Sequence, residues 1–246
     1  MGIKISIHKL PQMAIPIPRA PITPTTSTTP LIPTPLNQEI TKDQTKHTKP
    51  NDPKPGYSRP SKDRYRFIHH DHLGDKKKNW SLTPYREVII MGSSNISRLP
   101  RIHDARIQVD SYPGANLSHA INIIKYKTPT APEVTKVLLC FGLNDRGIGD
   151  RTILNNNLNQ LLSSARDTFP NAAIHVPKIN HSTKLSLKAI KNIGLLNKLI
   201  EKTPGNFKPL GAEDFDTEGD LIHWTPLTAK KMWDHWRSSL DLGHPN

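Results

Sequence analysis

Cysteine is almost absent from this chain, which has one, Cys140, among 246 residues. A disulfide framework within the chain is therefore excluded, and a lone thiol suits a reducing compartment. Cys140 lies inside the apolar run VTKVLLCFG, where a cysteine behaves as a small core residue, so we do not expect it to be a nucleophile. We expect an intracellular protein, cytoplasmic or nuclear.

Long apolar runs are missing as well. No stretch approaches the ~18 apolar residues of a membrane-spanning helix, so we expect no transmembrane segment. The early sequence MAIPIPRAPI is broken by prolines where a secretory signal needs a continuous apolar core, so we do not expect secretion. The cluster HHDH at 69–72 has no cysteine beside it, and we expect neither a bound metal nor a cofactor.

Large apolar side chains are scarce at the beginning of the chain, where proline and threonine are abundant. Of the 23 prolines, 12 lie within residues 1–60, and one stretch reads PITPTTSTTPLIPTP. Such a segment cannot bury enough apolar surface to offset the entropy lost on ordering it. We predict that residues 1–84 form a disordered, Pro/Thr-rich basic arm and that residues 85–242 form one folded domain.

Positive charge exceeds negative charge, and the excess is uneven. Residues 1–84 carry 14 Lys/Arg against 6 Asp/Glu, whereas residues 85–246 carry 20 against 15. Aromatic residues interrupt the basic stretches of the arm at Tyr57, Tyr65, Phe67 and Trp80. Such a segment could bind nucleic acid weakly by neutralising phosphates and stacking on bases, or it could be a solvated linker.

Strand-like and helix-like segments alternate along residues 85–242. Strands are predicted at 87–91, 106–114, 134–142 and 172–179, and helices at 116–127, 151–170, 185–204 and after Thr225. Thr225 is a plausible N-cap followed by Pro226, and the apolar face of this last helix is predicted to hold Leu227, Met232, Trp233, Trp236 and Leu240. The alternation predicts an α/β fold: a three-layer α/β/α sandwich with a mainly parallel, flavodoxin-like sheet of about five strands.

Three of the predicted strands end in polar or glycine-containing loops. These loops read GSSN at 92–95, YPGAN at 112–116 and GLND at 142–145. In parallel sheets the carboxyl ends of the strands share one rim, where binding sites form, so we expect the loops to meet there. The phrase DLIHW places Asp220 three residues before His223, a spacing that lets a carboxylate orient an imidazole in a tight turn.

These loops hold the groups that acyl transfer requires. The reaction needs a nucleophile, a base, a group that orients the base, and donors for the oxyanion. The candidates are Ser94 or Ser93, His223, Asp220, and the donors Gly114 N–H and Asn144 amide. Each loop alone has a simpler interpretation: Ser93, Ser94 and Asn95 could cap a helix beginning near Ile96, Gly114 could be a turn residue, and His223 could be structural.

Taken together, the four blocks resemble the SGNH hydrolases, or GDSL-like esterases. That superfamily is named for a Ser, a Gly, an Asn and a His in four blocks, matched in order here by GSSN, PGAN, GLND and DLIH between about Tyr85 and Leu242. The resemblance implies a small ester as substrate, with Ser94 as nucleophile and His223 as base. It implies that Asp220 orients the base, and that the Ser94 N–H, Gly114 and Asn144 form the oxyanion hole.

One position departs from the family's pattern. Its usual G-D-S reads Gly92-Ser93-Ser94 here, so a carboxylate that normally helps to hold the nucleophile loop is missing. Two functions stay open: an active serine esterase or acetyl-hydrolase, and a catalytically silent SGNH fold that serves as an assembly or nucleic-acid-binding module.

A narrower resemblance rests on two phrases and on the order of the segments. The phrases FDTEGDLIHWTPLTA and SYPGAN, together with the basic arm, look like SGNH-type domains in proteins of animal transposable elements, especially retroelements. This resemblance implies a protein derived from such an element.

Overall fold

The computed structural model describes residues 66–71, 80–128 and 133–243. The chain divides into two units, 1–55 and 56–246, and all of the described residues belong to the second. The predicted disorder of residues 1–65 and 72–79 lies outside the described residues.

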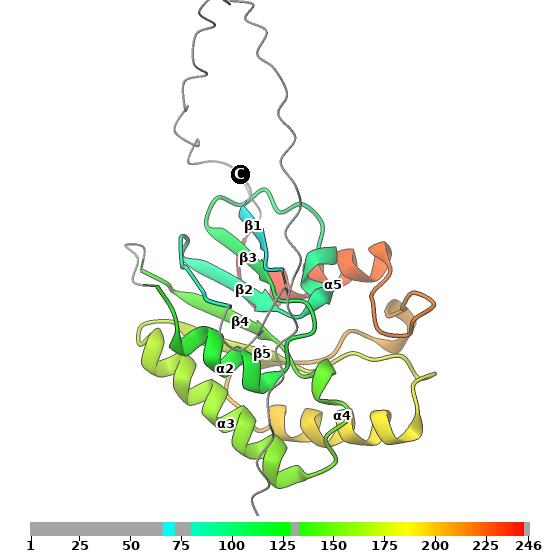
Figure 1. The fold of residues 1–246 in the computed structure, drawn as a ribbon. Helices are drawn as coiled ribbons and strands as arrows, with labels where there is room; N and C mark the ends of the chain where they lie inside the picture. Colours follow the sequence, from blue (N-terminus) through cyan, green and yellow to red (C-terminus); the bar gives the residue numbers. More distant parts are fainter. Residues whose placement is uncertain (1–65, 72–79, 129–132, 244–246) are drawn as a thin grey trace, which may run out of the picture. The chain divides into compact units, whose positions relative to one another are not determined.

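Six parallel strands form one sheet in the order β1-β3-β2-β4-β5-β6 (Figure 1). The strands are β1 Arg66–His69, β2 Val88–Gly92, β3 Ile107–Ser111, β4 Lys136–Cys140, β5 Ala173–Pro177 and β6 Asn206–Phe207. Without the edge strand β1, the order is the 2-1-3-4-5 order of flavodoxin-like folds. The predicted parallel, flavodoxin-like sheet is confirmed, with one strand more than the five expected.

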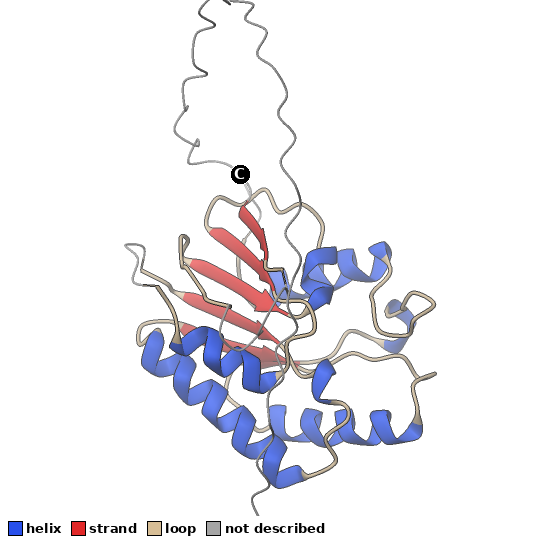
Figure 2. Ribbon diagram, in the orientation of Figure 1, coloured by secondary structure: helices blue, strands red, loops and turns tan. Residues whose placement is uncertain are grey.

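Helices cover both faces of the sheet, as Figure 2 shows. They are α2 Leu117–Lys125, α3 Arg151–Thr168, α4 Leu187–Ile200 and α5 Pro226–Ser239, with short 3-10 helices η1 Ser94–Arg98, η2 Leu143–Asp145 and η3 Ala212–Asp214. Helices α2, α3 and α4 pack on one face in one apolar cluster, whereas η1 and α5 pack on the other face. The central strand β2, VIIMG, is buried along its whole length, as expected of a strand covered on both faces. The predicted three-layer arrangement is confirmed.

The last helix, α5, begins where its sequence predicts, but its buried face differs from the predicted one. Thr225 caps it by accepting a hydrogen bond from the Thr228 N–H, and Pro226 occupies the first turn. The predicted apolar face is wrong at Leu227, whose side chain is 63% exposed. The buried positions in the helix are Thr228, Ala229, Met232, Trp233 and Trp236, and Leu240 is buried just after its end. These positions repeat at helical spacing, whereas Leu227, one residue before the first of them, points to another side of the helix.

Residues 66–71 and 80–84, which fall within the predicted arm of residues 1–84, pack with the domain in the structure. Strand β1 pairs with β3, and the His70 Nε2 atom lies 2.8 Å from Oδ1 of the fully buried Asp110. Trp80 is only 3% exposed and packs in the core, so it is unavailable for stacking on bases. A four-residue strand that pairs with a segment about 40 residues away leaves little local pattern in the sequence.

Among the helices that the structure describes, none is both long enough and apolar enough to cross a membrane.

Candidate active site

The loops after β2, β3 and β4 are hydrogen-bonded to one another at the carboxyl edge of the sheet. The Tyr112 N–H donates to the Gly92 carbonyl at 2.8 Å, which ties the second loop to the first. The Asn144 side-chain amide donates to the Ala115 carbonyl at 2.8 Å, which ties the third loop to the second. The rim expected from the sequence is therefore present.

The loop that carries the two serines is held by its backbone. The Ser93 N–H donates to the Cys140 carbonyl at 3.3 Å, and the Ser93 carbonyl accepts from the Ile96 N–H at 3.1 Å. A Cβ atom on Gly92 would lie 2.5 Å from the Cys140 carbonyl oxygen, so only glycine permits β2 and β4 to approach in this way. The Ser93 hydroxyl has no hydrogen bond to another described residue and does not cap η1.

Ser94 and His223, 129 residues apart in the sequence, meet at this rim. The Ser94 Oγ atom lies 3.1 Å from His223 Nε2, and the other ring nitrogen, Nδ1, is hydrogen-bonded to Asp220 Oδ2. The second Asp220 oxygen accepts the backbone N–H groups of Ile222 at 3.0 Å and His223 at 2.9 Å. The structure therefore brings together three of the predicted site residues in one chain of hydrogen bonds.

The turn around Asp220 keeps its carboxylate ionised. The backbone N–H of His223 is the main cause, followed by that of Ile222 and by the His223 ring, and together they hold the pKa of Asp220 well below its usual range. Between these residues Leu221 has a φ of +62°, in the left-handed region that a leucine rarely adopts. Backbone strain of this kind gathers at functional turns.

The predicted oxyanion donors lie in the neighbouring loops. Gly114 has a φ of +75° and is exposed. No hydrogen bond to another described residue occupies the backbone N–H of Ser94 or of Gly114. The Asn144 amide nitrogen carries two N–H groups, so one remains beside the bond to Ala115.

Asn95 is a residue of the site whose role the sequence reasoning missed. Its side chain is buried, donates through Nδ2 to the Ile222 carbonyl at 3.0 Å, and accepts through Oδ1 from the Trp224 N–H at 3.0 Å. The amide therefore fixes the chain on both sides of His223 to the loop that carries Ser94. Asparagine suits this position because one side chain both donates and accepts. The interpretation of Ser93, Ser94 and Asn95 as a helix cap is not supported, because Ser93 makes no side-chain cap bond and the side chains of Ser94 and Asn95 bind the histidine loop.

No family model matches this chain, and no curated protein matches it. Several solved structures are similar. The psychrotrophic esterase EstA from Pseudoalteromonas sp. is 16% identical, and the match covers 63% of this chain and 99% of that chain with a TM-score of 0.44. A carbohydrate esterase family 2 enzyme of Corynascus thermopiles is 13% identical. The match covers 65% of this chain and 68% of that chain, with a TM-score of 0.45. A lipase from a goat rumen metagenome is 11% identical. The match covers 63% of this chain and 97% of that chain, with a TM-score of 0.44. The case for a function rests on the site geometry.

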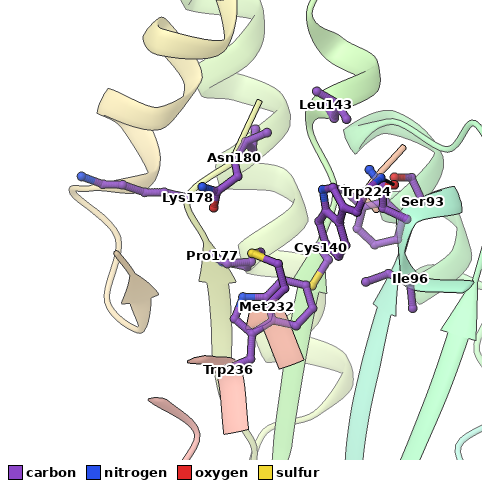
Figure 3. A pocket seen from close by; sticks show the side chains of 13 residues that line it. Ser93, Ile96, Cys140, Leu143, Pro177, Lys178, Asn180, Trp224, Met232 and Trp236 are labelled. Atoms are coloured by element: carbon purple, nitrogen blue, oxygen red, sulfur yellow. Dashed lines mark hydrogen bonds between the residues drawn. The ribbon is translucent and has the colours of Figure 1, made fainter. Parts of the chain in front are cut away.

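A small cavity is lined by residues adjacent in the sequence to Ser94 and His223, though not by these two residues themselves; Figure 3 shows its lining. Its volume is about 40 Å³, and its walls include the neighbours of Ser94 and the tryptophan that follows His223: Ser93, Asn95 and Trp224. Most of the remaining lining is apolar, from Leu143, Pro177, Met232 and others. Cys140 also lines it, and burial raises the pKa of this thiol well above its ordinary value. The space holds on the order of three water-sized groups.

A larger groove adjoins this cavity. Its volume is about 610 Å³, and it shares Ile179 and Asn180 with the cavity. The groove runs between residues 179–184 and 209–221, and Glu218, Gly219 and Leu221 of the Asp220 loop form part of its wall. The cavity and the groove are therefore continuous near the candidate site, but neither is lined by Ser94 or His223.

Asp145 is a buried carboxyl group behind the rim. Its Oδ2 atom accepts the Leu117 N–H at 3.0 Å, at the beginning of α2, whereas its Oδ1 atom is buried and has no hydrogen-bond partner among the described residues. Burial raises the pKa of Asp145 to about 6, against the effect of the bond from Leu117. At neutral pH the domain therefore carries a buried charge that is only partly compensated.

Proposed function

We propose that this protein is a serine ester hydrolase of the SGNH type. The observation that supports this best is the chain of hydrogen bonds from the Ser94 hydroxyl through the His223 ring to the Asp220 carboxylate. A hydroxyl becomes a useful nucleophile when a base accepts its proton, and the base works best when a third group fixes its orientation.

In the proposed mechanism, Asp220 holds the proton of His223 on Nδ1, which leaves Nε2 to accept the proton of Ser94. The Ser94 oxygen attacks the ester carbonyl, and His223 then gives the proton to the departing alcohol. Water, activated by His223 in the same way, hydrolyses the acyl-enzyme and releases the acid. The N–H groups of Ser94 and Gly114 and the free N–H of the Asn144 amide stabilise the oxyanion in both steps.

The shape of the site supports a small ester as substrate. The cavity of about 40 Å³ accommodates an acyl group of two or three carbons, and the groove of about 610 Å³ has room for a larger alcohol. We assign the acyl group to the cavity because sequence neighbours of Ser94 and His223 line it, namely Ser93, Asn95 and Trp224; Ser94 and His223 themselves lie outside its lining.

A fluorophosphonate probe tests the nucleophile directly, because it labels only a serine that a base activates. The full-length protein should be labelled at Ser94, Ser94→Ala should abolish labelling, and Ser93→Ala should retain it. Turnover of p-nitrophenyl acetate should follow the same order. Labelling that persists in Ser94→Ala, or that is lost in Ser93→Ala, would assign the nucleophile elsewhere.

A second function is favoured by one observation, the serine at position 93 where the family usually has aspartate. In this alternative the fold is catalytically silent and serves as an assembly or nucleic-acid-binding module. Wild-type protein that neither takes up the probe nor hydrolyses short p-nitrophenyl esters would support it over the esterase.

We also propose that the protein derives from a transposable element and that its basic amino-terminal arm binds nucleic acid weakly. The phrases SYPGAN and FDTEGDLIHWTPLTA and the charge of residues 1–65 support this origin. Finding the coding sequence in many genomic copies, beside a reverse transcriptase reading frame, is the expected result, and a single isolated copy would contradict it.

A further inference from the structure

Lysine is concentrated in one segment of the folded domain. Residues 178–208 contain seven lysines and a single acidic residue, Glu201. That glutamate is already engaged, because its carboxylate lies 3.0 Å from Lys178 Nζ. The segment therefore has a large positive excess that its own sequence does not neutralise.

Five of these lysines are exposed in α4 or close to its ends. Lys188, Lys191 and Lys198 are exposed on the helix, and Lys184 and Lys202 are exposed just before and just after it. We call these five residues the lysine face. The three helical positions span about 15 Å of helix axis. Within the described ranges, no carboxylate lies within ion-pair distance of any of the five.

A groove extends the lysine face toward α3. Its volume is about 330 Å³, and it is lined by Arg151, Thr152, Asn155, Leu199 and Lys202. The lining contains two cations and two neutral polar side chains but no carboxylate. An arginine fork, a hydroxyl and an amide all form hydrogen bonds with phosphate oxygens.

We propose that the lysine face and this groove bind the phosphate backbone of a nucleic acid, without sequence preference. Duplex DNA carries about one charge per 1.7 Å of axis, so a row of cations about 15 Å long meets several phosphates. Flexible lysines act as point charges and read no base edges. This surface consists of residues other than those of the amino-terminal arm, and the proposal does not depend on the esterase activity.

An anionic membrane fits this surface less well. A helix that lies on a membrane needs a wide apolar face toward the lipid. The apolar side of α4 is already used in the core, where Ala189, Ile193, Leu196 and Ile200 are buried. On the exposed side only Leu187, 85% exposed, offers a large apolar group in the helix.

The test is the salt dependence of DNA binding by the full-length protein. Fluorescence anisotropy with a labelled 24-base-pair duplex would be measured from 50 to 300 mM salt for the wild type and for Lys188→Glu/Lys191→Glu/Lys198→Glu. The control, Lys125→Glu/Lys208→Glu/Lys230→Glu, changes the net charge by the same amount at exposed positions outside the lysine face. Thermal unfolding would check that both variants fold.

We expect the α4 variant to bind at least about 10-fold more weakly at 100 mM salt. The slope of log Kobs against log salt should become less negative by about 2 to 3, since each lost phosphate contact contributes about 0.9. The control should keep the wild-type slope. Equal losses in both variants, unchanged binding in the α4 variant, or no DNA binding by the wild type would overturn the proposal. Binding to vesicles of phosphatidylcholine and phosphatidylserine (7:3) that depends on the lysine face, without such dependence for DNA, would overturn it in favour of a membrane.

Discussion

The acidic loop at 212–220 and the lysine face of α4 carry charges of opposite sign and use them differently. In the loop, Asp214 bonds Lys231 Nζ at 2.6 Å, Glu218 pairs with Arg98, and Asp220 holds His223 and its turn. On α4 the lysines have no acidic partner among the described residues and point to solvent. The acidic side chains are paired with other residues of the domain and hold the loop of the candidate site. The lysines are unpaired within the described part of the chain and are available to bind another molecule.

The largest effect should come from the charge that touches the candidate base. Asp220→Asn should lower kcat for p-nitrophenyl acetate by at least about 100-fold, because an amide lets the imidazole adopt the wrong tautomer. Asp216→Asn is the matched control in the same loop, since its side chain only accepts the Thr217 N–H and an amide oxygen can do the same. Equal losses in the two variants would mean that the loop's charge, and not the contact with His223, matters.

A smaller loss of activity is expected when the hydrogen bonds between Asn95 and the His223 loop are removed while the charges of the acidic loop are kept. Asn95→Ala should lower kcat by about 10- to 100-fold with little change in KM, because His223 is no longer held opposite Ser94. It should also lower the free energy of unfolding by on the order of 2 kcal/mol, since the Ile222 carbonyl and the Trp224 N–H lose their partner.

Asn95→Asp separates positioning from a purely structural role. An aspartate still accepts the Trp224 N–H, but once ionised it places an oxygen against the Ile222 carbonyl. Relative to the wild type, its kcat should therefore fall as the pH rises through the titration of the new carboxyl. An Asn95→Asp variant with the wild-type pH profile would show that the bond to Ile222 does not position His223.

Asp145 differs from both groups because its carboxyl group is buried and only one of its two oxygens accepts a hydrogen bond from a described residue. Its pKa is raised to about 6 in the folded state, so between about pH 4 and pH 6 the folded state binds more protons than the unfolded state. Stability then falls as the pH rises through this window and stays lower above it. Asp145→Asn, which can still accept the Leu117 N–H, should stabilise the domain at pH 8 by on the order of 2 kcal/mol and have almost no effect near pH 4. Urea unfolding at the two pH values measures this, and an equal effect at both would contradict the raised pKa.

The smallest effect is expected on α4. Lys188→Glu/Lys191→Glu/Lys198→Glu should leave the esterase rate unchanged and change the free energy of unfolding by less than about 1 kcal/mol, because exposed, unpaired side chains contribute little to folding. Thermal unfolding and p-nitrophenyl acetate turnover check this. A large loss of stability would mean that these lysines, like the acids of the loop, are part of the fold.

The sequence predicts those parts of the molecule that depend on local pattern. The strands ending at Gly92 and Cys140 follow from apolar runs, the strand ending at Ser111 follows from an alternating pattern closed by a turn, and the start of α5 follows from Thr225 and Pro226. Their meeting at one rim follows in turn, because parallel strands place their carboxyl ends together.

What the sequence does not predict depends on contacts between distant segments. Strand β1 is defined by its pairing with β3, and the role of Asn95 by the backbone of a turn 127 residues later. The side of α5 on which Leu227 lies depends on where the sheet is, which a helical pattern alone leaves open. In each case the local sequence is compatible with several structures, and contacts with distant segments determine which one forms.

The tight approach at Gly92 implies different mutational tolerance at two adjacent positions. Any side chain at position 92 would collide with the Cys140 carbonyl and push the following turn outward, so this position is closed to substitution. At position 93 backbone bonds hold the turn, and the buried Ser93 hydroxyl forms no hydrogen bond with another described residue. Under the proposed SGNH assignment, serine replaces the aspartate of G-D-S at a position whose side chain does not hold Ser94 in place. A search for the G-D-S motif would therefore miss chains in which a serine, a histidine and an aspartate have the same arrangement.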